Sequence, residues 1–96
     1  MVKQDVQNII ISHLKGFNPL RIALFGSFVR KDIMPPNDID ILVKFKETLS
    51  LIQLISIENE LSDKLGIRVD LITEGSLKNE RMKKSILNDM QIIYQA

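Results

Sequence analysis

Segments with two different hydrophobic periods alternate along this chain, and that alternation limits its fold more than any other feature. Apolar residues recur every three or four positions in residues 2–14 and 51–65, as they do on one face of a helix. Short apolar runs at residues 20–25 and 38–45, and the alternating residues 67–72, instead indicate strands. Helices interleaved with short strands predict an α/β or α+β layer structure around a small mixed β-sheet.

Residues that stop or start helices set the expected boundaries. Gly16 is expected to end the first helix in a left-handed conformation, and Gly66 the second. Ser50 followed by Gln53 matches a capping box at the start of that second helix. Ser76 is expected to cap a third helix that runs to about residue 88, before a last strand at residues 90–94. Residues 28–33 suit a short helix or turn, and the Pro-Pro pair in residues 34–37 requires a loop.

The composition excludes several classes of protein. With 96 residues, the chain is expected to form one domain, over residues 1–96. It contains no cysteine and one histidine, which leaves no disulfide framework and no zinc site with sulfur ligands. A formal net charge of +1 argues against sequence-independent binding of nucleic acid. No segment has the length of a membrane span or the pattern of a signal peptide, so we expect a cytoplasmic protein.

Two carboxylates open the apolar strand at residues 38–45. Asp38 and Asp40 are two residues apart, so both side chains project from one face of the strand, within about 6–7 Å of each other. Such an arrangement suits Mg²⁺, which takes one or two protein carboxylates and completes its shell with water and phosphate. Acids at the start of an apolar strand can also be turn caps or solvent-facing residues, but their burial is costly without a partner.

The pair Gly26-Ser27 follows the preceding apolar strand and is suited to holding phosphate. Gly26 allows a close approach of the backbone, and the amide and hydroxyl of Ser27 can donate to phosphate oxygens. By itself the pair is more typical of an ordinary turn at the end of a strand. Asp70, inside the third strand, can serve as a third carboxylate that binds a second metal ion and helps to deprotonate an incoming hydroxyl. It can also simply form an ion pair with Arg68.

Gly26-Ser27, ten further residues and then Asp38-Ile39-Asp40 resemble the signature of the DNA polymerase β-like nucleotidyltransferases, and more narrowly that of the minimal nucleotidyltransferases. The similarity runs over nearly the whole chain and includes Val69-Asp70-Leu71. It implies the polymerase β-like fold. It also implies an antitoxin that transfers AMP from ATP to a tyrosine of a HEPN ribonuclease toxin, in a hetero-oligomer with that toxin.

The resemblance also implies roles for single residues. Gly26, Ser27 and Arg30 would bind the nucleotide, while Asp38, Asp40 and Asp70 would be the catalytic residues and would hold Mg²⁺, with two ions expected. The chain departs from the common pattern at two positions. Lys31 stands where many relatives carry glycine, and Asn37 where serine often precedes the first aspartate. Neither change removes a metal ligand.

Several polar residues have simpler interpretations. His13 falls on the apolar stripe of the first helix, where a half-buried histidine usually serves packing. Tyr94 is expected to pack in the last strand. The basic residues at positions 78, 81, 83 and 84 spread around their helix and suit a solvated surface, or contact with an acidic partner.

Two alternative functions remain open at this point. One is a module that neutralises a toxin by binding alone, with no catalysis. The other is the catalytic subunit of a small-molecule nucleotidyltransferase, whose acceptor is held by a separate chain. In the first alternative the nucleotide pocket would be vestigial or merely structural. For a transferase the acceptor is expected to arrive on another chain, because residues 1–96 leave little structure for holding it.

Overall fold

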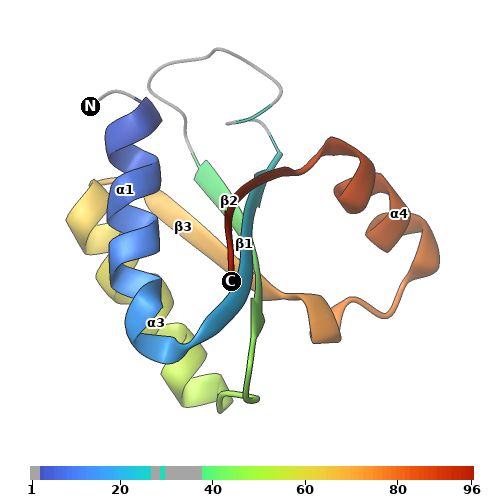
Figure 1. Ribbon diagram of the computed structural model, residues 1–96, viewed down its shortest axis with the longest axis horizontal. Coiled ribbons are helices and arrows are strands. Elements are labelled where there is room, and N and C mark those ends of the chain that lie inside the picture. Colours follow the sequence, from blue (N-terminus) through green and yellow to red (C-terminus); the bar gives the residue numbers. More distant parts are fainter. Residues whose placement is uncertain (1–2, 27–28, 30–37) are drawn as a thin grey trace.

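The computed structural model describes residues 3–26, 29 and 38–96 of the chain. The described residues form three α-helices, two short 3₁₀ turns and four strands (Figure 1). In chain order these are α1 (Lys3–Leu14), η1 (Lys15–Phe17), β1 (Pro19–Phe25), β2 (Asp38–Phe45), α3 (Leu51–Leu65), β3 (Arg68–Thr73), η2 (Glu74–Ser76), α4 (Glu80–Asp89) and β4 (Gln91–Gln95). The predicted mixture of helices and strands is confirmed. None of the described helices is long and apolar enough to cross a membrane.

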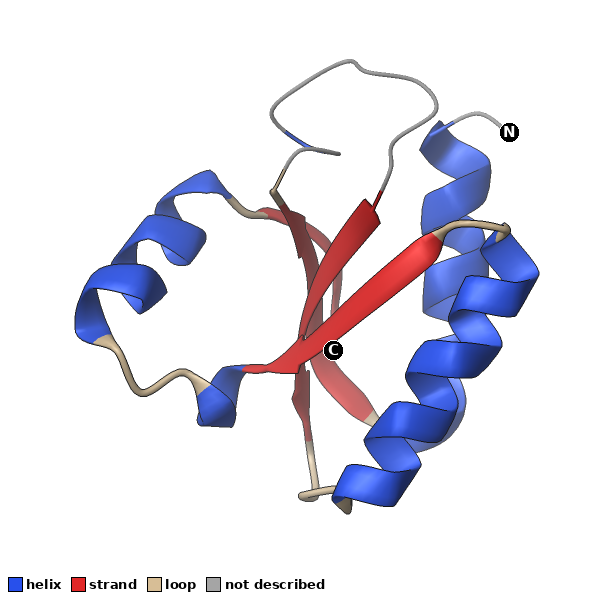
Figure 2. Cartoon of the chain, turned by 180° about the vertical axis from the view of Figure 1, so that it is seen from behind, coloured by secondary structure: helices blue, strands red, loops and turns tan. Residues whose placement is uncertain are grey.

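The four strands form one mixed sheet in the order β3-β2-β1-β4. β1 pairs antiparallel with both β2 and β4, whereas β2 and β3 are parallel and are connected through α3. Figure 2 shows α1 and α3 on one side of the sheet and α4 on the other. No residue of α4 is buried, so the sheet face on that side is covered far less than the face beneath α1 and α3.

The alternation of side chains along β2 explains which face carries the acids. Ile39, Ile41 and Val43 belong to the hydrophobic core shared with α1 and α3. Because neighbouring side chains on a strand point to opposite faces, Asp38 and Asp40 project from the other face. The apolar period of β2 therefore both builds the core and directs the acids toward the side of α4.

The predicted start and end of α3 are confirmed. The Ser50 hydroxyl accepts from the backbone N–H of Gln53 at 3.1 Å, and the Gln53 side chain accepts from the Ser50 N–H at 2.9 Å. Gly66 closes the helix with a left-handed φ of 67°. Each interaction is local in sequence, which is why a single sequence was enough to predict it.

Two other predicted helix boundaries are wrong. The left-handed residue after α1 is Asn18, with a φ of 57°, and not Gly16, because a 3₁₀ turn extends the helix end by three residues. Ser76 does not cap α4, since its hydroxyl donates to the carbonyl of Thr73 within η2. Asn79 caps that helix instead, and its side chain accepts from the N–H of Met82 at 3.1 Å.

Arg21, the charge that interrupts the apolar run of β1, has a specific partner. Its guanidinium donates two hydrogen bonds to the Glu74 carboxylate, at 2.8 and 2.6 Å. This partly buried pair raises the pKa of Arg21. It links β1 to η2 across β2, and η2 in turn follows directly on β3.

His13 is half-buried between α1 and α3, as its place on the apolar stripe predicted. Its Nδ1 lies 2.9 Å from the Nζ of Lys64, and its buried Nε2 has no hydrogen-bond partner among the described residues. Burial lowers the pKa of His13 from its usual 6.5, and the positive charge of Lys64 lowers it further, against an opposing effect of Glu60. The fold therefore favours the neutral ring.

We expect this histidine to make the protein less stable in acid. The pKa of His13 is lower in the folded state than in the unfolded state. Its contribution to the free energy of unfolding is therefore complete above pH 6.5 and is lost as the pH falls through the folded pKa. Thermal unfolding between about pH 7.5 and about pH 5 should show a smaller fall in Tm for His13→Gln than for the wild type. Parallel curves for the two proteins would contradict this interpretation.

Candidate active site

Gly26 ends β1 in a conformation that only glycine adopts readily. Its φ is 80°, and a Cβ on this residue would collide with Oδ2 of Asp40. The backbone of Gly26 therefore lies directly against one of the predicted metal-binding carboxylates. Sequence spacing suggested that these positions act together, and the structure shows Gly26 and Asp40 in contact distance.

The strand pairing brings the third carboxylate to the same place. Phe25, at the end of β1, pairs with Asp40, and Asp40 pairs with Asp70 on the parallel strand β3. Asp38 begins β2 two residues earlier, on the same face as Asp40. All three aspartates are half-buried. The structure therefore gathers Gly26, Asp38, Asp40 and Asp70 at one end of three adjacent strands.

Arg68 lies beside these acids. It pairs in register with Asp38, and its Nε lies 3.6 Å from Oδ1 of Asp70. The side chain of Arg68 is 74% exposed, so this ion pair is worth only about 0–1 kcal/mol. This ion pair agrees with the simpler interpretation of Asp70, as a partner of Arg68. Because the pair is weak, the carboxylate can still bind a ligand that binds more strongly.

The donor set is suitable for Mg²⁺. Carboxylate oxygens on rigid strands are hard ligands, and Mg²⁺ typically takes one or two of them together with water and substrate phosphates. Among the described residues, no three acidic or histidine side chains converge on one point. Any Mg²⁺ held at the aspartates would therefore need further ligands from water or substrate phosphates.

Ser27 and Arg30, the other two predicted nucleotide-binding residues, lie outside the described residues. The same holds for Lys31 and Asn37, where the sequence departs from the family pattern. Their assignment to the nucleotide therefore stays a prediction from sequence.

Two residues of α3 contribute to the site in a way that the sequence analysis missed. Glu58 accepts a hydrogen bond from the backbone N–H of Leu71 at 2.8 Å, and the Ser62 hydroxyl accepts from that of Val69 at 3.0 Å. These two N–H groups flank Asp70 on the outer edge of β3. The only sequence signal was a glutamate on the apolar stripe of a helix, where a charge requires a partner.

Replacing Glu58 by alanine should destabilise the fold by about 1–2 kcal/mol, because it removes a charge-assisted hydrogen bond to a strand edge. Urea unfolding measures this as a lower midpoint with an unchanged slope. Asp63→Ala removes an exposed acid from the same helix and should change the stability by less than about 0.5 kcal/mol. Equal effects of the two substitutions would show that the hydrogen bond to β3 contributes nothing.

Comparison with known proteins shows what this chain is similar to. The family described as "Polymerase beta, Nucleotidyltransferase" matches residues 7–96. A protein of Methanocaldococcus jannaschii, MJ1217, provisionally named a protein adenylyltransferase, is 43% identical over 90 residues, covering 90% of this chain and 92% of that protein. Protein adenylyltransferase MntA of Thermococcus cleftensis is 36% identical over 91 residues, or 91% of each chain.

A solved structure is similar in fold over almost the whole chain. It is that of a tri-AMPylated HEPN toxin from Shewanella oneidensis in complex with its MNT antitoxin. The TM-score is 0.82 at 25% sequence identity, and the match covers 99% of this chain and 74% of the other.

Proposed function

The chain belongs to the polymerase β nucleotidyltransferase family, and on that premise we propose that it is an antitoxin that transfers AMP from ATP to a tyrosine hydroxyl of a HEPN toxin. The observation that carries this proposal is that residues at the ends of three adjacent strands lie next to one another. Gly26 lies against Asp40, and Asp40 lies beside Asp70. A phosphate held at the Gly-Ser pair would therefore lie next to the carboxylates.

The proposal assigns a role to each residue of the site. Gly26 leaves room for the triphosphate, and Ser27 and Arg30 bind its oxygens. Asp38, Asp40 and Asp70 would hold the Mg²⁺, with two ions expected. When bound, Mg²⁺ neutralises the negative charge that develops on the phosphates during the transfer.

The reaction is an in-line displacement at phosphorus. The tyrosine oxygen forms a bond to the α-phosphorus of ATP, the bond from this phosphorus to the bridging oxygen of the β-phosphate breaks, and pyrophosphate leaves. The proton of the tyrosine hydroxyl passes to a carboxylate of the site, and we assign this task to Asp70. It projects from the sheet face that α4 leaves largely uncovered, so a partner protein can approach it.

A partner protein is part of the proposal because the described residues form the core and the catalytic strands. They leave little structure that could hold an acceptor. The HEPN–MNT complex of similar fold supports a hetero-oligomer of toxin and antitoxin. We propose that the two proteins meet in the cytoplasm, where ATP is supplied.

The test is transfer of label from ATP, labelled at the α-phosphate, to a purified HEPN toxin in the presence of Mg²⁺. We expect label on the toxin, and no label after the acceptor tyrosine is replaced by phenylalanine. Neutralisation of the toxin without any label would instead support the binding-only antitoxin. Label on a small acceptor, but not on protein, would support the small-molecule transferase.

A further inference from the structure

Helix α4 adds no residue to the hydrophobic core, although its start is well defined. Asn79 caps its first turn by accepting from the N–H of Met82, and none of its residues is buried. Met82 and Leu87 are apolar, yet they are 55% and 37% exposed. The packing of the core therefore does not account for the sequence of α4.

The segment that contains α4 is rich in positive charge. Residues 78–89 carry four basic and two acidic side chains, whereas the whole chain has a formal net charge of only +1. The basic ones, which we call the basic cluster, are Lys78, Arg81, Lys83 and Lys84. None of the four forms an ion pair or a side-chain hydrogen bond within the part of the chain that the structure describes. The basic cluster is therefore available to an external anion.

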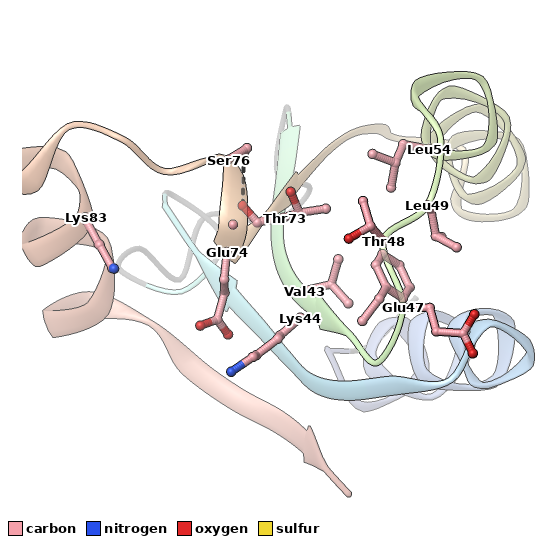
Figure 3. A pocket seen from close by; sticks show the side chains of 12 residues that line it. Val43, Lys44, Glu47, Thr48, Leu49, Leu54, Thr73, Glu74, Ser76 and Lys83 are labelled. Atoms are coloured by element: carbon pink, nitrogen blue, oxygen red, sulfur yellow. Dashed lines mark hydrogen bonds between the residues drawn. The ribbon is translucent and has the colours of Figure 1, made fainter.

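Lys83 shows that the nearest carboxylate does not neutralise the cluster. Its side chain projects from α4 toward the cavity at the far ends of β2 and β3, which Glu74 also lines (Figure 3). The Glu74 carboxylate is already held by Arg21, through hydrogen bonds of 2.8 and 2.6 Å. Lys83 is thus left without a carboxylate partner among the described residues.

An open hollow of about 370 Å³ lies along one face of α4. The residues that line it are three or four positions apart on the helix, or adjacent, and so share a face: Glu80, Lys83, Lys84, Leu87 and Asn88. Exposed apolar side chains and arginine are typical of surfaces that bind other proteins, and here Met82 and Arg81 lie on the same helix. The hollow suits a protein surface that carries acidic side chains beside an apolar one.

The position of α4 directs such a protein toward the candidate active site. The three aspartates project from the sheet face opposite α1 and α3, and Figure 2 shows α4 on that side. The strand that follows α4 begins at Gln91, which pairs with Leu24, two residues before Gly26. The helix therefore ends beside the strand end that carries Gly26, and a protein bound to α4 would lie next to the carboxylates.

The chemistry of this surface favours a protein over a nucleic acid. Residues 78–89 contain no aromatic side chain on which a base could stack. Glu80 lines the hollow itself and would repel a phosphate backbone. The exposed Met82 and Leu87 instead offer apolar area that a protein side chain can cover.

We propose that α4 docks the protein that accepts AMP, and that Arg81, Lys84 and Leu87 meet an acidic surface next to the acceptor tyrosine. The inference rests on the proposed transfer of AMP and adds the surface by which this chain recognises its partner. Opposite charges accelerate the encounter and fix the orientation of the two proteins. The helix that leaves the core unused thereby gains a function.

Charge reversal on α4 tests this docking surface. Arg81 and Lys84 are exposed, so a variant with both Arg81→Glu and Lys84→Glu should keep its fold. In transfer of label from ATP to the HEPN toxin, we expect its KM for the toxin to rise by about tenfold or more, with kcat within about twofold of the wild type. Its affinity for Mg·ATP, measured by titration calorimetry, should also stay within about twofold.

A single substitution has a matched control. Lys84→Glu should raise the KM for the toxin, whereas Lys46→Glu should leave it unchanged. Lys46 is likewise exposed and unpaired among the described residues, but it lines neither the cavity nor the hollow. Raising the NaCl concentration from about 50 to about 300 mM should weaken the wild type more than the double variant, because salt screens exposed charges.

Three outcomes would overturn the docking surface. The first is a KM of the double variant within about twofold of the wild type, and the second is an equal rise for Lys46→Glu. The third is binding of a single-stranded RNA of about 20 nucleotides that the double variant loses, which would assign the basic cluster to nucleic acid.

Direct binding of the toxin separates this inference from the proposed function. Should the wild type transfer no label, calorimetry with the HEPN toxin still compares the wild type with the double variant. Binding that the double variant loses would support the docking surface and count against the transferase reaction. Equal binding by the two proteins would reject the docking surface.

Discussion

Asp40→Asn is expected to lower AMP transfer by about three orders of magnitude. Asp40 lies between Gly26 and Asp70, so its carboxylate is the one shared by the phosphate end and the third acid. Charge stabilisation by bound metal ions is worth several kcal/mol in such a transfer, and each 1.36 kcal/mol corresponds to tenfold in rate. The measurement is the initial rate of label transfer to the toxin under saturating ATP.

The control for this substitution is Asp63→Asn, which makes the same chemical change at an exposed position of α3. Its transfer rate should equal that of the wild type. The two variants should also unfold within a few degrees of the wild type, since neither enlarges a cavity. A transfer rate for Asp40→Asn within about tenfold of the wild type would remove Asp40 from the catalytic machinery.

Gly26→Ala is expected to impair both stability and transfer. A left-handed φ costs a residue with a Cβ about 1–2 kcal/mol, and here the Cβ would also collide with Oδ2 of Asp40. To relieve the collision, either the strand end or the carboxylate must move. We therefore expect a lower Tm together with a fall in transfer of at least about 100-fold.

Gly66→Ala separates these two causes. Gly66 has a similar φ of 67°, but a Cβ there would meet no atom of the described residues within 4 Å. It should therefore lose stability through backbone strain alone and keep its transfer rate. Equal loss of transfer in the two variants would mean that reduced stability, and not displacement of Asp40, explains the effect at Gly26.

Much of the fold could be predicted from the sequence, because the signals are local. The period of the apolar residues indicated the helices and strands, and the Ser50–Gln53 capping box and Gly66 set the ends of α3. The boundaries that were wrong involve competition between neighbours. Asn18 replaced Gly16, and Asn79 replaced Ser76, because Gly16 and Ser76 themselves belong to short 3₁₀ turns.

The sequence by itself determined which chemical groups are present and which of them share a face. The spacing of Asp38 and Asp40 places both on one side of β2, since side chains on a strand alternate. The ten residues between the Gly-Ser pair and Asp38 also complete the signature that the chain shares with its family. Both conclusions concern residues that are close along the chain.

Only the tertiary structure decided which strands lie next to each other. The pairing of Asp40 with Asp70, the contact of Gly26 with Asp40, and the support of β3 by Glu58 join residues 13 to 30 positions apart. Such contacts depend on strand order and register, which follow from how the whole core packs and not from any local pattern. A cavity at the far ends of β2 and β3 is likewise lined by residues that are far apart along the chain, such as Val43, Glu74 and Lys83.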